Sequence, residues 1–352
     1  MLEEPRERPV IGKVKHAQGS CGGSCFGGQE PDGVIACDPL PPGVRFPNEA
    51  RAALLITFDV EGDYGNGTGD VDLEIANYRR ICAHLMDRGV KATFNVVGQM
   101  ADERGPEFVE WMFDAGGEVA SHGYVHDMNK RYGGDLFRAG DYGRRENVEQ
   151  VRDGVAALSR IRPGSVCGIR MPYGHFNEHT YDAICEAGLI WASNLGIDDL
   201  VAPGQGFGGR PFQVQMGAKR YPTVEIPLDT QTFDWSIWMA DEAANGAFVR
   251  AVEAYCRLRH MPFERTPAQG VDIWRRRMLE TIEHESVFTL LCHPINLAVR
   301  NAGFGDPVTE FLFPVIDLLG AYQEERKAWV CTCGELAQFY LQEQHEERRQ
   351  EA

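Results

Sequence analysis

Two short segments of this chain combine residue types that can bind a metal ion and activate a water molecule. Thr57-Phe-Asp-Val-Glu-Gly-Asp63 follows an apolar run, and Ser121-His-Gly-Tyr-Val-His126 comes later in the chain. Carboxylate oxygens and imidazole nitrogens are the ligands of catalytic zinc sites, which leave one position open for water. A divalent ion that holds water is well suited to the hydrolysis of an amide. The two segments therefore predict a metal-assisted hydrolase.

Each of these residues also has an ordinary structural interpretation. Two histidines four residues apart, such as His122 and His126, can be satisfied by backbone carbonyls. Asp59 can cap the loop that follows it, Arg170 can be a salt-bridge partner, and His293 can be a core histidine. The chemical interpretation therefore depends on whether the fold brings these residues together.

The sequence alternates between patterns typical of strands and of helices. Strands are expected at 52–58, 91–97, 118–121, just before 170, 191–194, 224–228, 287–292 and 329–331, and helices at 73–88, 107–115, 144–161, 178–186, 248–258, 271–283 and 314–325. The Gly/Pro-rich stretch 197–223 is expected to be an irregular insertion that forms a wall or lid over the substrate. About seven strands alternating with helices indicate an α/β barrel, in which sites gather at the carboxyl ends of the strands.

The candidate residues follow these predicted strands. Asp59 and Glu61 come after the first strand, His122 and His126 after the third, Arg170-Met-Pro-Tyr-Gly174 after the fourth, Asp234-Trp235 after the sixth and His293 after the seventh. Because parallel strands end at the same side of a barrel, we expect these side chains to meet on one face. That convergence carries more weight than any single motif.

Composition narrows the class of protein. The chain has 352 residues, of which 43% are hydrophobic, and a formal net charge of -17. The negative charge would repel phosphate groups, so we expect no nucleic-acid partner and no membrane-surface role. The first residues carry charges and prolines where a signal peptide has an apolar core, and no window is apolar enough to cross a membrane. We expect a cytoplasmic protein without membrane insertion, and the sequence leaves a homo-oligomer open.

The chain is expected to form one catalytic domain with two extensions. The predicted parts are a flexible Gly- and Cys-containing arm at 1–50, the catalytic domain at 51–341 and a charged tail at 342–352. The arm contains four residues whose spacing permits a small zinc site, with incidental thiols as the alternative: His16, Cys21, Cys25 and Cys37. Cysteines within apolar patterns, such as Cys82, Cys185 and Cys292, are expected to be reduced and mostly buried.

Taken in order, the motifs resemble those of the polysaccharide deacetylase superfamily, also called the NodB-homology or carbohydrate esterase family 4 group. The motifs that carry this resemblance are Thr57-Phe-Asp59, His122-x-x-x-His126, Arg170-x-Pro-Tyr-Gly174, Asp234-Trp235 and Leu291-x-His293. The resemblance covers nearly the whole chain apart from the arm. It implies a deformed (β/α) barrel of about seven strands. It also implies a divalent metal, commonly Zn²⁺, with Co²⁺, Ni²⁺ or Mn²⁺ as alternatives.

The resemblance also implies a role for each matching residue. Asp59 would be the general base, His122 and His126 metal ligands, Arg170 the residue that orients the base, Tyr173 and Trp235 substrate-binding residues, and His293 the general acid supported by Asp234. The backbone near Tyr173 would help to hold the oxyanion.

The first motif departs from the usual pattern of the superfamily. The usual motif has two adjacent aspartates, the second of which binds the metal, whereas Val60 occupies that position here. The chain instead resembles the branch with an Asp-Val-Asp motif, in which Glu61 stands in for the second aspartate. Residues two apart on a strand share a face, so Asp59 and Glu61 can both point into the site. Asp63 remains a second candidate ligand.

That branch includes a peptidoglycan deacetylase, and cyclic-imide hydrolases and allantoinase-like enzymes are close to it. The resemblance therefore implies N-deacetylation of an acetylated amino sugar or a related small substrate. A cyclic amide or imide hydrolase and a non-catalytic carbohydrate-binding relative are the alternatives. Trp191, Trp235 and Trp238 are candidates to stack on a sugar face, with a place in the core as the other interpretation.

Overall fold

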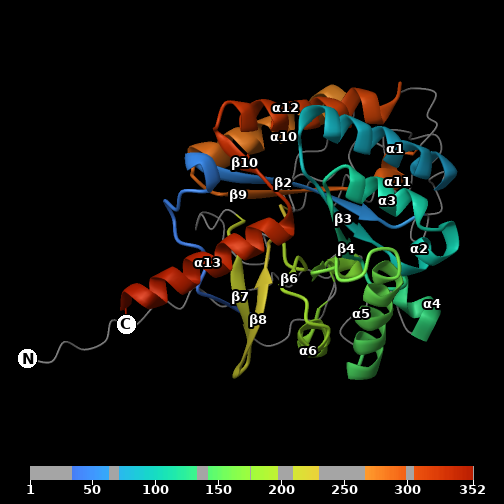
Figure 1. The fold of residues 1–352 in the computed structure, drawn as a ribbon, viewed down its shortest axis with the longest axis vertical. Coiled ribbons are helices and arrows are strands. Elements are labelled where there is room, and N and C mark those ends of the chain that lie inside the picture. The colour runs from blue at the N-terminus through green and yellow to red at the C-terminus, as the bar shows by residue number, and fades with distance from the viewer. Residues whose placement is uncertain are drawn as a thin grey trace, which may run out of the picture.

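A computed structural model of the chain describes residues 34–62, 71–132, 142–174, 176–196, 209–229, 266–298 and 305–351. Within these residues ten strands form one mixed sheet with helices packed around it (Figure 1). The strands are β1 (Val34–Cys37), β2 (Ala52–Val60), β3 (Thr93–Val96), β4 (Glu118–Ser121), β5 (Gly168–Ile169), β6 (Trp191–Ala192), β7 (Phe212–Met216), β8 (Lys219–Glu225), β9 (Val287–Cys292) and β10 (Ala328–Val330). Their order is β1-β7-β8-β6-β5-β4-β3-β2-β10, and β9 also pairs with β2.

The strands from β2 onward form a parallel series, to which β1 and β7 add antiparallel pairs. β2 pairs in parallel with β3, β9 and β10, and the series continues through β4, β5, β6 and β8. β7 pairs antiparallel with β8 on one side and with β1 on the other. Parallel neighbours need a crossover connection, which explains why helices lie between most of these strands in the chain.

The described helices are α1 (Val71–Arg88), α2 (Gly98–Arg104), α3 (Glu107–Asp114), α4 (Met128–Tyr132), α5 (Arg144–Ser159), α6 (Glu178–Glu186), α10 (Pro267–Glu283), α11 (Pro294–Leu297), α12 (Phe313–Glu324) and α13 (Cys333–Glu351). Short helical turns lie at η1 (Pro47–Glu49), η3 (Pro172–Gly174) and η4 (Val308–Leu312). Local sequence explains where some helices begin. Asn177 and Thr180 form a capping box at the start of α6, and Thr266 caps α10 just before Pro267.

β2 divides the interior of the protein into two faces. It is buried along its whole length, and its even-numbered residues pack into a core formed with α1, α3 and α12. On the opposite face, Ala53 and Leu55 belong to a separate apolar core, and Thr57 and Asp59 follow them. Because side chains alternate along a strand, one face of β2 is apolar at its amino end and polar at its carboxyl end. This change places the polar residues at the edge where a site forms.

The two ends of the parallel series approach each other. The Asp229 N–H, which follows β8, donates to the Thr289 carbonyl oxygen in β9 at 3.2 Å. A single bridge also joins Gly196 to Leu228. Together with the parallel pairing of β9 to β2, these contacts bend the sheet toward closure. The predicted α/β architecture, with a sheet of mostly parallel strands, is confirmed.

The structure differs from the sequence prediction at the two extensions and in the insertion. β1 and η1 lie within the predicted flexible arm, since β1 pairs with β7 far along the chain. β7 and most of β8 occupy the stretch 212–223 that was predicted to be irregular. α13 continues through the predicted charged tail, whose Glu, Gln and Arg residues are good helix formers. Pairing between distant strands is not visible in local sequence patterns.

Several other expectations concern residues outside the described ranges. These are the candidate ligands His16, Cys21 and Cys25, Trp238 and the predicted helix 248–258. Among the described cysteines no disulfide is formed, and Cys82 and Cys292 are buried, as expected of reduced core thiols. Across the ranges given above, no helix is both long enough and apolar enough to span a bilayer.

Trp191 belongs to the core and not to a sugar-binding surface. Its side chain is fully buried, and its indole N–H donates to Glu118 Oε1 at 2.9 Å. The indole ring lies against Gly168 of the neighbouring strand, where a Cβ would come within 1.8 Å of the ring. Only glycine leaves room for this ring at that position.

We predict that Gly168→Ala lowers the free energy of unfolding by about 3 kcal/mol, because the added methyl group must displace the buried Trp191 ring. Gly188→Ala is the control, since Gly188 has a φ of +71° but nothing within 4 Å of the added Cβ. The free energy of unfolding of Gly188→Ala should fall by about 1 kcal/mol, from backbone strain alone. Urea unfolding followed by circular dichroism measures both. Equal losses in the two variants would contradict the packing argument.

Candidate active site

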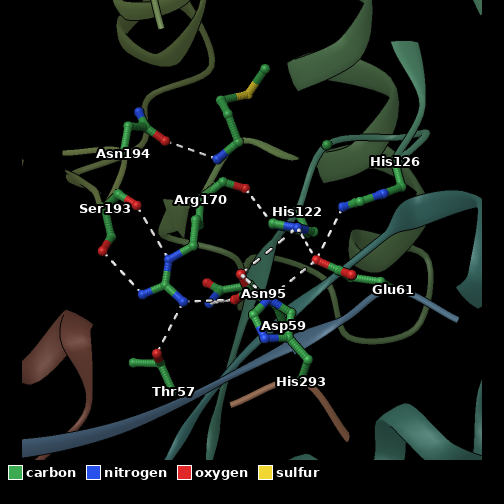
Figure 2. Close-up of polar contacts among 12 residues, drawn as sticks. Thr57, Asp59, Glu61, Asn95, His122, His126, Arg170, Ser193, Asn194 and His293 are labelled. Atoms are coloured by element: carbon green, nitrogen blue, oxygen red, sulfur yellow. Dashed lines mark hydrogen bonds and ion pairs between the residues drawn. The ribbon is translucent and has the colours of Figure 1, made fainter. Parts of the chain in front are cut away.

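A cluster of buried polar residues lies at the carboxyl ends of β2, β3, β4 and β9 (Figure 2). Asp59 is in β2, and Glu61 follows that strand directly. Asn95 is the register partner of Asp59 in β3. His122 follows β4 and His293 follows β9. The parallel sheet therefore brings residues that are far apart in the sequence to one place, as their positions after predicted strands indicated.

Glu61 is the centre of a group of imidazoles. Its Oε1 lies 3.0 Å from His126 Nε2, 3.3 Å from His122 Nε2 and 3.7 Å from His293 Nε2. Glu61, His122 and His126 are all buried, and each can offer one ligand atom to a common cation. Glu61 also forms a second such group with Asp59 and His293.

Hydrogen bonding fixes the ring of His122 in a form that suits metal binding. His122 Nδ1 lies 2.7 Å from the Arg170 carbonyl oxygen. A carbonyl oxygen only accepts, so Nδ1 carries the proton and the neutral ring has its lone pair on Nε2. Nε2 is the atom that faces Glu61. A hydrogen bond from the other ring nitrogen to a carbonyl is the usual support of a metal-binding histidine.

His126 supplies a second sign that the site fits a cation. It is 3% exposed, and among the described residues neither of its ring nitrogens has a hydrogen-bond partner of acceptable geometry, although Nε2 is close to Glu61. Buried polar atoms without hydrogen bonds are rare in folded proteins and need an explanation. A metal ion bound by this nitrogen satisfies it. The donor set of one carboxylate and two imidazoles matches that of catalytic zinc sites.

Asp59 is held by an ion pair with Arg170. Arg170 Nη1 donates to Asp59 Oδ1 at 2.6 Å, and both side chains are almost fully buried. Asn95 Nδ2 donates to the same oxygen at 2.8 Å. The other oxygen, Oδ2, lies 3.9 Å from His122 Nε2 and 4.0 Å from His293 Nε2. Asp59 therefore has one oxygen bound to the protein frame and one facing the histidines.

Arg170 donates three further side-chain hydrogen bonds. Nη1 donates to Thr57 Oγ1 at 3.0 Å, Nη2 donates to Ser193 Oγ at 3.0 Å, and Nε donates to the Ser193 carbonyl oxygen at 3.2 Å. The Thr57 hydroxyl in turn donates to the Leu290 carbonyl, and the Ser193 hydroxyl donates to the Ile226 carbonyl. These bonds tie the guanidinium to several strands, so its orientation is set by the sheet.

The charged neighbours determine how the two carboxylates ionise. Burial by itself raises the pKa of Asp59, but Arg170, His122 and His293 outweigh it and lower the pKa below its usual value. Burial also raises the pKa of Glu61, but His126, His293 and His122 together hold it well below its usual range. Both groups are therefore carboxylates near neutral pH, as a base and a metal ligand must be.

A second layer of hydrogen bonds lies behind Arg170. Asn194 Oδ1 accepts from the Met171 N–H at 2.8 Å. Glu225 Oε1 accepts from the N–H groups of Asn194 at 2.5 Å and Leu195 at 2.8 Å, while its Oε2 accepts from the Tyr181 hydroxyl at 2.7 Å. Burial raises the pKa of Glu225 to about 7, against the opposing effect of these donors.

Tyr173 lies beside the histidines in an unusual backbone conformation. It has a φ of 57° within η3, and its ring centroid is 4.4 Å from that of His126. A non-glycine residue in the left-handed region costs free energy and occurs most often at functional sites. The Pro-Tyr-Gly turn therefore lies against the histidine cluster.

The structure brings together most of the residues that the sequence singled out. Asp59, Glu61, His122, His126, Arg170, Tyr173 and His293 all lie in or against the cluster. Asp234, Trp235 and the second candidate ligand Asp63 lie outside the described residues. Val60 points to the opposite face, into the core beneath the helices.

Sequence analysis missed the residues that support this cluster. They are Asn95, Ser193, Asn194 and Glu225. The sequence did contain an indication of two of these residues, since Asn95 interrupts an apolar strand and Glu225 lies between apolar residues. Polar residues that are fully buried in strands are uncommon unless they have specific partners. Those partners come from other strands, so the sequence alone could not name them.

Comparisons with known proteins agree with this geometry. Residues 48–190 match the family model described as polysaccharide deacetylase. A search of curated protein sequences finds no match. The resemblance predicted from the motifs is confirmed, and the matched residues include Asp59, Glu61, His122, His126 and Arg170 but end before Asp234 and His293.

Solved structures share the fold at low sequence identity. A structure from Mycobacterium smegmatis, described as a polysaccharide deacetylase, is 21% identical with a TM-score of 0.63, covering 88% of this chain and 96% of that one. A second, from Pseudomonas aeruginosa PAO1 and described in the same way, is 16% identical with a TM-score of 0.58, covering 86% and 95%. A Puue allantoinase is 14% identical with a TM-score of 0.52, covering 85% and 93%.

We predict that His122→Ala and His126→Ala each abolish zinc retention and activity together, because each removes one of the imidazoles beside Glu61. Metal content per chain, measured by mass spectrometry after gel filtration, is the primary readout. His284→Ala is the matched control, since His284 is exposed at the end of α10. Full activity in a metal-free His126→Ala variant would disprove the assignment.

We predict that the free energy of unfolding of Glu225→Gln increases relative to that of the wild type as pH rises. The folded pKa of Glu225 is about 7 against an ordinary value of 4.5, so the folded state binds this proton more tightly than the unfolded state. The stabilisation from that proton is complete below the ordinary value and is lost as pH rises through about 7, a change of about 3 kcal/mol. Glutamine removes the titration but keeps an oxygen for the two N–H donors. Urea unfolding of both proteins at about pH 5 and about pH 8 measures this change in the free energy of unfolding. The same difference between the two proteins at both pH values would contradict the prediction.

Proposed function

We propose that the protein is a divalent-metal-dependent hydrolase that removes an acetyl group from an N-acetylated amino sugar or a related small substrate, because residues 48–190 match the family model described as polysaccharide deacetylase. The observation that carries this proposal is the buried Glu61–His122–His126 group next to a carboxylate, Asp59, that Arg170 holds in place. This arrangement supplies the ligands for a cation and a base beside them.

Glu61, His122 and His126 would hold the metal ion. Zinc is the first candidate because mixed nitrogen and oxygen ligands suit it, and Co²⁺, Ni²⁺ and Mn²⁺ are alternatives. When bound, such an ion acidifies water and polarises an amide carbonyl. Glu61 is a better ligand than Asp59, because its Oε1 is closer to both imidazoles and the Asp59 Oδ1 is already bound by Arg170 and Asn95.

Asp59 would act as the general base. Its Oδ2 faces the histidines and can accept a proton from the attacking water, while Arg170 keeps the other oxygen fixed. A positioned base of this kind contributes about 10²–10⁴-fold to a rate. The water oxygen then forms a bond to the amide carbon, and the negative charge moves to the carbonyl oxygen. The backbone turn at Tyr173 would stabilise that charge.

His293 would act as the general acid. Its Nε2 is 4.0 Å from Asp59 Oδ2 and 3.7 Å from Glu61 Oε1, so it borders the same space from the side of β9. An amine leaves an amide only after its nitrogen is protonated, and His293 is the imidazole that the proposed metal ligands do not include. Asp234 would support its charged form.

We expect His293→Ala to retain its metal but to lose turnover by about 10²–10⁴-fold, since a general acid is removed and the ligands are not. Turnover and metal content are measured on the same preparation. Tyr173→Phe is a useful comparison, because the proposed role of Tyr173 uses its backbone and not its hydroxyl group. Unchanged turnover in His293→Ala would remove this residue from the acid role.

The substrate is tested with a panel of amides supplied to the zinc-loaded protein. Release of acetate from N-acetylated amino sugars and their oligomers supports the deacetylase. Ring opening of cyclic imides, without acetate release, assigns the same chemistry to a different substrate class. Bound metal without hydrolysis of any amide overturns the enzymatic proposal and favours a carbohydrate-binding protein.

A further inference from the structure

Asn95 is a buried amide that the mechanism above does not use. It lies in β3, directly across the parallel ladder from Asp59, and its side chain has no solvent exposure. The flanking residues Phe94 and Val96 pack into the apolar core on the opposite face. Asn95 therefore stands on the inner face of the sheet, where β2 carries its own polar residues.

The amide of Asn95 has only one orientation that agrees with its surroundings. Its Nδ2 lies 2.8 Å from Asp59 Oδ1. A carboxylate oxygen only accepts hydrogen bonds and the amide oxygen cannot donate, so the NH₂ group must face Asp59. The amide oxygen of Asn95 then has no hydrogen-bond partner among the described residues. Such a buried polar atom costs about 1–3 kcal/mol, so stability alone does not favour asparagine here.

The two oxygens of Asp59 have different surroundings because of this contact. Oδ1 accepts from Arg170 Nη1 at 2.6 Å and from Asn95 Nδ2 at 2.8 Å. Oδ2 faces the Nε2 atoms of His122 and His293 at 3.9 Å and 4.0 Å. Asn95 lies in β3 and Arg170 directly follows β5, so the two donors on Oδ1 come from different segments of the chain.

We propose that Asn95 is a positioning residue that fixes the carboxylate of Asp59 so that Oδ2, and only Oδ2, receives the proton. This inference rests on the proposed function of Asp59 as the base. In the step itself, one O–H bond of water breaks, an O–H bond forms on Oδ2, and the electron pair left on the water oxygen forms the bond to the amide carbon. Oδ1 keeps its two hydrogen bonds throughout.

Arg170 alone does not define the orientation of the carboxylate. One donor on one oxygen leaves rotation about the Cβ–Cγ bond of Asp59 partly free, because the oxygen can remain close to the guanidinium while the other oxygen moves. A second donor from a different strand fixes the plane of the carboxylate. Positioning of a base within a fraction of an ångström is worth a large factor in rate.

The test uses Asn95→Leu, which keeps the branched shape of the side chain and removes the donor, and Asn95→Ala, which removes the donor without adding apolar atoms. On the N-acetylated sugar, we expect kcat to fall by about 30-fold in both variants, with KM unchanged within about twofold. Zinc content should match that of the wild type, since Asn95 contacts none of the proposed ligands. Asn147→Ala is the matched control. Asn147 is also a buried amide, bonded to α6 through Thr180, and its loss should lower stability without changing kcat.

A double-mutant cycle separates positioning from a general loss of structure. In the Asp59→Asn background the base is gone, so Asn95→Leu should change the residual kcat by less than about twofold. A fall of the full size in that background would show that Asn95 acts on something other than Asp59. A kcat within about twofold of the wild type in both single variants would also overturn the proposal.

Crystal structures of the wild type and Asn95→Leu keep the inference testable if no amide is hydrolysed. Absence of turnover in the wild type would remove the proposed function, whereas the orientation of Asp59 is read directly from electron density. Rotation or a second conformer of the Asp59 carboxylate in Asn95→Leu supports the positioning role. An unchanged carboxylate in that variant, with Arg170 as its sole remaining donor, overturns it.

Discussion

The buried ion pair between Arg170 and Asp59 is the constraint on which the rest of the site depends. Removing two charges from water costs several kcal/mol per ion, and attraction between them offsets this only when the remaining hydrogen bonds are satisfied. Here the guanidinium bonds to Asp59, Thr57 and both oxygens of Ser193. Those partners are in turn bonded to the backbone of neighbouring strands. The charge can be buried because the strands around it have one fixed arrangement.

The same residue links Asp59 to the histidine cluster. The side chain of Arg170 holds Asp59, and its backbone carbonyl accepts from His122 Nδ1. Arg170 therefore contributes both to the orientation of Asp59 and to the choice of the ring nitrogen that His122 presents. A second layer of hydrogen bonds supports this segment, since Asn194 accepts from the Met171 N–H and Glu225 accepts from the Asn194 N–H.

Glu61 differs from Asp59 in the groups that surround its carboxylate. It is a buried carboxylate surrounded by His122, His126 and His293, and among the described residues no arginine forms an ion pair with it. A divalent cation among the same atoms would satisfy the carboxylate and the ring nitrogens at once. Asp59 is thus paired with a fixed cation of the protein, whereas Glu61 lies among groups that could bind a cation from solution.

The sequence by itself determined the class of fold, the side of the sheet where the site lies and most of the residues in it. Strand-length apolar runs followed by Asp59, His122, Arg170 and His293 carry that information, because the alternation of strand and helix patterns along the chain is a local property of the sequence. The sequence also indicated Glu61 as a candidate metal ligand, since Val60 occupies the usual ligand position and cannot bind a metal.

Only the tertiary structure determined which partners these residues have. Asn95, Ser193 and Glu225 matter because of partners on other strands, and β1 forms because β7 lies beside it. The assignment of Trp191 to the core likewise depends on Gly168 in the next strand. Hydrogen bonds and ladders between segments distant in the chain have no local sequence period. Their partners are fixed by the packing of the whole sheet, and the sequence of any one segment does not contain them.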